Sequence, residues 1–280
     1  MTKVIKKTLK TTTHFCGNVF QTLLFCIKVL IRTDLKNHIP QIENAGPLTI
    51  LANGPSLKDD IEKIDFEVGD FSVLNDFYKS PYFDRVKPKF YVLADPLYFT
   101  KDSETELTLR SITSDIKLFV PFGWWKNASV LDRINNPHIQ FVPYHTLTYN
   151  GFESVRYWFY RHGLSMPRPQ NVLVPSIFNA INMGYKEIRI YGADHSWTES
   201  IRVDEQNRVC LTDSHFYDTE KVNMNPWHKC TGEQYLMHEI LRDLASMFDS
   251  YHFLKRYADA RGCRIINCTK NSYIDAFERS

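Results

Sequence analysis

The order of apolar and polar residues along the chain predicts short buried strands that alternate with helices. Apolar runs with the length of buried strands lie at 48–52, 71–74, 90–94, 116–120, 139–142, 188–191 and 264–267. Apolar residues recur at helical spacing in three intervening segments, at 57–64, 176–183 and 235–260. Such alternation predicts an α/β fold with a mostly parallel, Rossmann-like sheet.

Polar residues lie at the carboxyl ends of five of these predicted strands. They are Asn53, Asn75, Asp95, Asp194 and Asn267. Ligands of parallel sheets bind beyond the carboxyl ends of the strands, so we expect a binding site at this edge. Taken singly, each residue also has the alternative role of a simple helix cap.

The turn after the first strand reads Asn53-Gly54-Pro55-Ser56. Gly54 permits a close approach of the backbone to a ligand, and Pro55 fits the first turn of a helix. Backbone N–H groups at that helix start would then face an anion. The alternative for Ser56 is a plain N-cap. A second helix start, at Ser176, predicts a similar anion site, with Asn171 before it as a further candidate.

Residues 1–38 differ from the rest of the chain. Lysines precede an apolar stretch at 15–31 whose apolar residues recur at helical spacing, with polar interruptions. We expect an amphipathic helix that lies in the headgroup region of a membrane and is attracted by anionic lipid. The alternatives are a helix packed on the body or a dimer contact. The predicted division is an anchor and linker at 1–45 and a catalytic domain at 46–280.

Composition narrows the class of protein. The net charge of +2 over 280 residues gives no global field for nucleic acid, so a nucleic-acid partner is not expected. The six cysteines contain no C-x-x-C pair, and no cleavable signal peptide is evident. These features predict a cytoplasmic protein, peripheral on the inner face of the cell membrane.

The periodicity fails between residues 195 and 232, where the chain is polar and irregular. A loop of this length in a compact domain is usually a lid or a binding segment. It contains the histidines His195, His215 and His228, and Tyr217.

Four segments, in this order and spacing, carry a resemblance to a known family: Ile50-Leu-Ala-Asn-Gly-Pro-Ser-Leu57, Leu74-Asn75, Ala94-Asp95-Pro96 and Met183-Gly-Tyr-Lys-Glu-Ile-Arg-Ile-Tyr-Gly-Ala-Asp194. They resemble the bacterial sialyltransferases of glycosyltransferase family 42, a variant of the GT-A fold. The chain is also similar to polysaccharide-cluster proteins that share a domain with archaeal 6-hydroxymethylpterin diphosphokinases.

The resemblance to the sialyltransferases implies a CMP-activated sugar donor, inversion at the anomeric carbon, no metal and no other cofactor. It assigns donor contacts to Asn53, Gly54, Ser56 and Asn75, with Pro55, Asn171, Ser176 and Asp194 as further donor-site candidates. The family's asparagine after the third strand is Asp95 here, which makes Asp95 a further donor-site candidate. A carboxylate beside a phosphate is repelled unless a cation or proton intervenes, and the alternative for Asp95 is to accept a ribose or sugar hydroxyl. The acceptor would be a surface glycan or a lipid-linked glycan. The chain also contains no D-x-D pair, the usual metal-binding signature of metal-dependent sugar transferases.

Attack by an acceptor hydroxyl requires a general base, and histidine suits cytoplasmic pH. The family's catalytic histidine aligns with no histidine of this chain, which leaves three candidates. His215 ranks first, followed by His195, whose tautomer Asp194 would fix, and His228. Tyr217 is a candidate to stabilise the leaving phosphate; its alternative is a packed aromatic of the lid.

Two other function classes remain open at this point. One is a pyrophosphokinase or phosphotransferase in which Asp95, Asp194 and His215 hold Mg²⁺. The other is a protein of a polysaccharide assembly complex that binds nucleotide sugars without catalysis.

Overall fold

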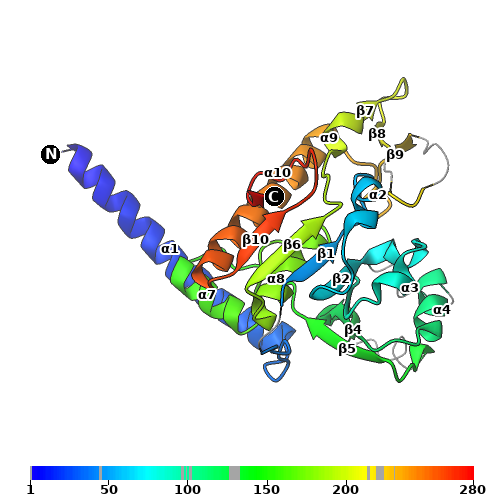
Figure 1. Ribbon diagram of the computed structural model, residues 1–280. Helices are drawn as coiled ribbons and strands as arrows, with labels where there is room; N and C mark the ends of the chain where they lie inside the picture. Colours follow the sequence, from blue (N-terminus) through cyan, green and yellow to red (C-terminus); the bar gives the residue numbers. More distant parts are fainter. Residues whose placement is uncertain are drawn as a thin grey trace.

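The computed structural model describes residues 2–43, 46–95, 98, 100, 103–125, 133–212, 215–218, 224–229 and 231–280. Side chains are described from residue 12 onward, except that of His14. In this part of the chain the main sheet has eight strands, all parallel, in the order β11-β10-β6-β1-β2-β3-β4-β5. The predicted α/β class with a Rossmann-like parallel sheet is therefore confirmed (Figure 1).

The strands of the main sheet are β1 (Leu48–Leu51), β2 (Asp70–Leu74), β3 (Phe90–Val92), β4 (Ile116–Pro121), β5 (Ile139–Tyr144), β6 (Glu187–Tyr191), β10 (Arg264–Asn267) and β11 (Glu278–Arg279). The described helices are α1 (Thr2–Arg32), α2 (Leu57–Asp60), α3 (Phe83–Val86), α4 (Glu104–Ser111), α5 (Phe122–Trp125), α7 (Glu153–Arg161), α8 (Leu173–Met183), α9 (Trp197–Ser200) and α10 (Met237–Ala260), with 3-10 turns η1 (Ile61–Lys63) and η2 (Asn75–Lys79).

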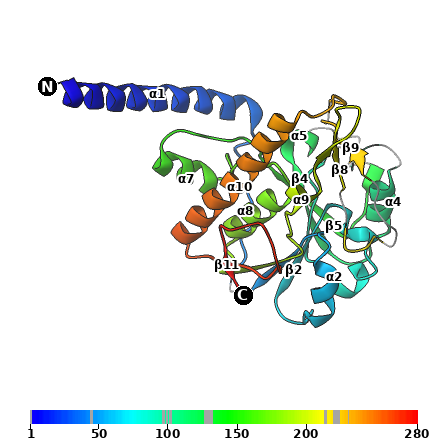
Figure 2. The ribbon, with the colours of Figure 1, turned by 90° about the horizontal axis from the view of Figure 1, so that it is seen from above.

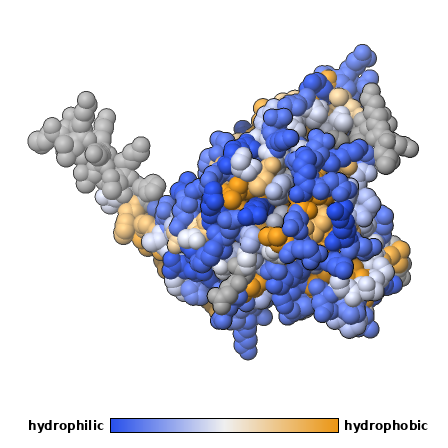
Figure 3. Space-filling view, viewed as in Figure 1, coloured by the Kyte–Doolittle hydropathy of each residue, from blue (hydrophilic) through white to orange (hydrophobic). Residues whose placement is uncertain are grey.

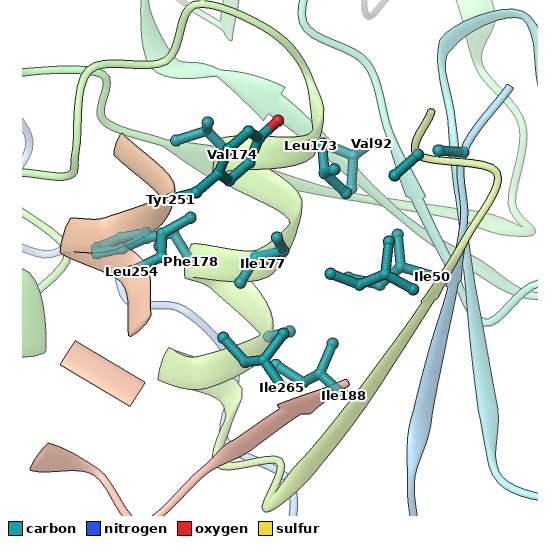
Figure 4. Close-up of a cluster of buried hydrophobic side chains, with 14 of the residues drawn as sticks. Ile50, Val92, Leu173, Val174, Ile177, Phe178, Ile188, Tyr251, Leu254 and Ile265 are labelled. Carbon is teal, nitrogen blue, oxygen red and sulfur yellow. The ribbon is translucent and has the colours of Figure 1, made fainter. Parts of the chain in front are cut away.

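Helices cover both faces of the sheet, which is why β1 is buried along its whole length. One face packs against α8 and α10, and the other packs against α2, α3 and α4 (Figures 1 and 2). Figure 4 shows α8 between the two layers: Ile177 faces Ile50 and Ile188 of the strands, while Phe178 lies beside Leu254 of α10. Every residue of α8 is buried, including the polar Ser176, Asn179 and Asn182.

The strand order reverses at β1. The chain runs from β1 outward through β2, β3, β4 and β5, then returns to place β6 on the other side of β1. Leu51 at the end of β1 pairs with Val73 of β2 and with Tyr191 of β6. The residues that follow these strands therefore emerge together at the point where an open α/β sheet has its crevice.

The segment expected to be an irregular lid at 195–232 contains a second sheet. Three short antiparallel strands form it, β7 (Arg202–Val203), β8 (Val209–Leu211) and β9 (Asn225–Pro226). Strands of two or three residues with exposed ends give no alternating pattern long enough to recognise in the sequence.

The N-terminal helix α1 extends beyond the body of the protein (Figures 1 and 2). Among the side chains of α1 that the structure describes, Phe25 and Val29 are buried against Tyr149, Phe159 and Leu164. Thr22 is hydrogen-bonded to the Tyr149 hydroxyl at 2.6 Å, and the ring of Phe15 lies 5.5 Å from that of Phe152. Other apolar side chains of α1 are exposed: Phe15, Val19, Phe20, Leu23, Leu24, Ile27, Leu30 and Ile31. Figure 3 shows apolar side chains gathered where α1 meets the body.

By length and composition, the stretch Phe15–Arg32 is long and apolar enough to cross a membrane, with a mean hydropathy of 1.4. Helices of other kinds, such as signal sequences, meet the same criterion. The predicted amphipathic helix is present, and the alternative of a helix packed on the body applies to its narrow stripe at Phe25 and Val29.

Candidate functional site

A cavity of about 430 Å³ opens at the crevice between the carboxyl ends of β1 and β6. Its lining comes from the strand ends, from the start of α8 and from the segment after β6. The residues are Ala52, Asn53, Gly54, Pro55, Leu74, Asn75, Asn171, Val172, Leu173, Gly192, Asp194, His195, Ser196, Trp197, Glu199, Ser200, Thr212 and His215. Its volume lies within the usual range for small-molecule sites, roughly 300–1,000 Å³.

The turn after β1 is bonded to the turn after β6. Ser56 donates its hydroxyl to Asp194 Oδ2 at 2.9 Å and its backbone N–H to Asp194 Oδ1 at 3.2 Å. Gly54 donates its N–H to the Gly192 carbonyl at 2.8 Å. Ser56 makes no capping bond to α2, so the plain N-cap alternative does not describe it.

Gly54 is required here by space. A Cβ at this position would lie 2.0 Å from Asp194 Oδ2 and 2.5 Å from the Gly192 oxygen, far inside contact distance. Gly54 therefore does permit a close approach to its backbone, as expected, but the approaching groups are Asp194 and Gly192 and not a ligand. The expectation that the N–H of Ser56 is open to a ligand anion is wrong, because Asp194 already accepts from it.

Burial raises the pKa of Asp194, and the hydrogen bonds from Ser56 lower it by a smaller amount. The carboxylate is thus less stabilised than one in water, although two donors face it. Asp194 contributes a negative group to the cavity wall, which disfavours ligands of high negative charge near β6.

Asn53 and Asn75 connect the ends of neighbouring strands. Asn53 donates its side-chain N–H to the Leu74 carbonyl at 3.0 Å, and its Oδ1 is buried without a hydrogen-bond partner in the described structure. Asn75 accepts from the Ala94 N–H at 3.4 Å and adopts a positive φ of 42°. Orphaned acceptors and left-handed backbone at non-glycine residues concentrate at functional sites.

Asn171, His195 and Tyr251 form a hydrogen-bonded group that joins α8, β6 and α10. The Asn171 oxygen accepts from the N–H groups of Leu173 and Val174, at 3.0 and 3.2 Å, and so caps α8. Its amide N–H group therefore faces the other two side chains, 3.1 Å from His195 Nε2 and 2.8 Å from the Tyr251 hydroxyl.

This arrangement fixes the state of His195. Its ring is bonded to the Ala193 backbone, and its Nε2 lies 2.5 Å from the Tyr251 hydroxyl, with the Asn171 amide on the same nitrogen. Nε2 accordingly acts as the acceptor, and burial lowers the pKa of His195 to about 3. A base with so low a pKa is weak at neutral pH. The expected control by Asp194 is absent, since that carboxylate turns toward Ser56.

His215 reaches the cavity from the irregular segment. Its side chain is 32% exposed, its Nδ1 lies 3.7 Å from Asp218 Oδ2, and its ring stacks on Tyr217 at 5.2 Å. The next residue, Phe216, is buried against Phe77 and donates its N–H to the Asn53 carbonyl at 3.1 Å. Through Phe216, the chain therefore holds His215 beside the turn after β1.

Five predicted residues do not line the cavity, and the first of them is Ser56, which is bonded to Asp194. Asp95 follows β3, two strands away from β1, and strand spacing of about 4.8 Å carries it out of the crevice. Ser176 is buried inside α8 because the helix begins at Leu173, a turn earlier than predicted. Tyr217 packs against the hydrophobic cluster that includes Phe77 and Phe216, in agreement with the alternative of a packed aromatic residue in the lid. His228 is exposed and pairs with Gln234.

Sequence reasoning missed five polar or aromatic residues of the lining: Ser196, Trp197, Glu199, Ser200 and Thr212. Glu199 accepts from the Tyr273 hydroxyl at 2.5 Å. The first four lie within six residues of Asp194, in the segment that follows β6. Because ligands bind where the strand order of an open α/β sheet reverses, this position alone could have marked them as candidates.

No protein-family model matches the chain. No curated protein matches it either. Among solved structures, the chain is similar to the MAf glycosyltransferase from Magnetospirillum magneticum AMB-1, with 15% sequence identity and a TM-score of 0.47. The likeness covers 87% of this chain and 35% of that one, so the chain spans about a third of the length of that protein. At these values the likeness assigns no activity to the chain.

Proposed function

We propose that the chain is a glycosyltransferase that binds a nucleotide-sugar donor in the cavity between β1 and β6. The observation that carries this proposal is the convergence of the Asn53–Ser56 turn with Asn75, Asn171 and Asp194 at the switch point of a parallel sheet. These elements are distant in sequence, and together they line a polar volume of the size that a small-molecule ligand needs.

The donor is a CMP-activated sugar of the sialic-acid type. The resemblance of the four sequence segments supports this choice, and so does the charge of the wall. A CMP-sugar carries one phosphate charge, whereas a nucleoside diphosphate sugar carries two. Asp194 therefore repels the single phosphate of a CMP-sugar less than it would repel a diphosphate, and the carboxylate of a sialic acid would have to lie away from Asp194.

The reaction is a metal-independent displacement in which an acceptor hydroxyl attacks the anomeric carbon and CMP leaves, with inversion. His215 takes the hydroxyl proton: Asp218 faces its Nδ1, and Nε2 on the other side of the ring receives the proton. His195 holds the start of α8 and the end of β6 together and is a positioning residue in this scheme.

The phosphotransferase alternative required Asp95, Asp194 and His215 to converge on Mg²⁺. In the described part of the chain no group of three such side chains is arranged to hold a metal ion, and Asp95 lies outside the cavity lining. The geometry favours sugar transfer over that scheme. Detectable hydrolysis of a CMP-sugar would separate transfer from the non-catalytic binding alternative.

The first prediction tests the donor. In a thermal-shift assay, CMP is expected to stabilise the protein more than UDP, GDP or ATP, with EDTA and with Mg²⁺ alike. At about 100 times the dissociation constant, binding contributes roughly 2.7 kcal/mol to the free energy of unfolding. A clear response to UDP or ATP beside none to CMP would overturn the donor assignment, and a response that requires Mg²⁺ would favour phosphotransfer.

The second prediction concerns α1, which we propose lies on the cytoplasmic face of the membrane and brings the site to a lipid-linked or surface glycan. Replacing the exposed Leu23, Ile27 and Leu30 by Gln leaves the packed stripe intact. This triple variant is expected to stop floating with anionic vesicles while the body melts as before. The matched control replaces Leu241 and Val68, which are equally exposed on the body. Flotation of the triple variant at the control's level would contradict membrane contact through α1.

A further inference from the structure

A second cavity, of about 180 Å³, adjoins the first and shares Asn171 and Trp197 with it. It lies between α10 and the segment that follows β6. Beyond the shared residues, three apolar side chains of α10 form its floor, Ile240, Leu244 and Met247, and its walls are Gln170, Trp227, Tyr235 and Asp243.

Aromatic rings dominate one wall of this cavity. Trp227 and Tyr235 pack with ring centroids 5.6 Å apart and planes inclined by 58°. Their backbones are fixed, because Trp227 donates to the Val209 carbonyl at 2.8 Å and Tyr235 donates to the Trp227 carbonyl at 3.0 Å. Trp197 enters from α9, its ring 4.7 Å from that of His195. The cavity thus presents several rings that the local structure holds in place.

A fixed carboxylate lies beside the rings. Asp243 accepts from Gln170 at 3.0 Å through Oδ1 and from the Tyr235 hydroxyl at 3.2 Å through Oδ2. Its side chain remains 40% exposed, and Arg168 lies 3.8 Å away. A carboxylate held in this way has lone pairs left for further donors, and it repels anions.

This combination fits one class of ligand. A pyranose has an apolar C–H face that stacks on an aromatic ring and an edge of hydroxyl groups that donate to carboxylates and amides. The carboxylate of Asp243 disfavours a phosphate beside it, and Arg168, 3.8 Å away, offsets only part of that repulsion. A purely apolar ligand would leave the remaining lone pairs of Asp243 without a donor from the ligand. The cavity is also small, of the order of one sugar ring.

We infer that this second cavity is the acceptor subsite and holds a neutral pyranose of the acceptor glycan. The inference rests on the proposed function. Because Asn171 and Trp197 line both cavities, a sugar stacked on Trp227 lies next to the donor cavity. The donor and the acceptor then lie on the two sides of Asn171 and Trp197. Trp227, Tyr235 and Asp243 determine which acceptor sugars bind.

The test uses binding alone, with defined probes. Saturation-transfer NMR is recorded on the full-length protein with the methyl pyranosides of galactose, glucose, N-acetylglucosamine and N-acetylgalactosamine. At least one is expected to bind through its C–H face protons. Trp227→Ala should weaken that binding by about tenfold or more, and Trp227→Phe, which keeps a ring, should lose less. Asp243→Asn should weaken it while leaving the fold intact. Trp158→Ala, at a tryptophan 52% exposed on α7, is the matched control and should bind as the unmodified protein does.

Absence of binding by all four sugars would overturn the inference, and so would equal binding by the unmodified protein, Trp227→Phe and Asp243→Asn. Thermal shift with CMP on the same samples tells this failure apart from failure of the proposed function. A CMP response without sugar binding removes only the acceptor subsite. Sugar binding that depends on Asp243, without any CMP response, removes the donor assignment and leaves the saccharide site in place.

Discussion

The two walls of the main cavity are held in different ways. The wall at the ends of β1 and β6 is bonded internally, since Ser56, Gly54, Gly192 and Asp194 saturate one another. The other wall belongs to the segment after β6. There the position of His215 is set by its neighbour Phe216, which packs against Phe77. The first wall is held by hydrogen bonds within the protein and is suited to donor recognition. The second wall carries His215, the titratable group that the proposed sugar transfer requires as its general base.

The largest expected effect belongs to the second wall. His215→Ala should lower turnover by roughly 10²–10⁴-fold, which is the usual contribution of a positioned general base, with CMP affinity unchanged. The measurement pairs steady-state transfer with CMP thermal shift. His228→Ala is the matched control, because that histidine lies in the same segment but is exposed and outside the cavity lining. Full turnover in His215→Ala would show that the base lies elsewhere.

A smaller effect is expected at the first wall. Gly54→Ala places a methyl group 2.0 Å from Asp194 Oδ2, so the two turns must separate. We expect a loss of roughly 1–3 kcal/mol in the free energy of unfolding, together with weaker CMP binding. Gly123→Ala is the control, since a Cβ there meets nothing within 4 Å. Equal denaturant midpoints for the two variants would mean that the turns are not coupled.

The smallest effect concerns pH and the group that joins the two walls. His195 has a pKa of about 3 when folded and an ordinary value of 6.5. The unfolded chain therefore binds the extra proton between these values, and stability should fall as the pH drops from 6.5 toward 3. The contribution of one such group is at most about 1.4 kcal/mol per pH unit. His195→Gln should flatten the decline in melting temperature between pH 6.5 and 5, and an unchanged slope would show that His195 is solvated.

The contrast between the two walls also explains which parts of the site can be predicted from the sequence. Leu48–Leu51 is a buried run whose length marks it as a strand, and Glu187–Tyr191 alternates half-buried and buried residues. Asn53 and Asp194 lie just beyond the ends of these two strands. Their meeting at one crevice then follows from the topology of parallel sheets.

Contacts between distant residues were beyond such reasoning. Asp194 was expected beside a donor phosphate, and its bond to Ser56 appears only when β6 lies next to β1. Ser176 was misplaced because Asn171 caps the helix from three residues before Val174, which lengthens α8 by a turn. Trp197 and Glu199 line the cavity because of the course of the chain after β6. That segment has no periodic pattern of apolar residues, so the local sequence does not predict its course.

The space between Gly54 and Asp194 also constrains how the sequence can change over time. The space of a side chain at position 54 is filled by the carboxylate at position 194, so position 54 cannot vary alone. A larger residue at 54 requires that 194 shrink and that the Gly192 carbonyl, 2.5 Å from the added Cβ, move away, and Ser56 then loses the partner of its hydroxyl. Among descendants of this chain, the three positions are therefore expected to covary as one unit, even though 138 residues separate Ser56 from Asp194.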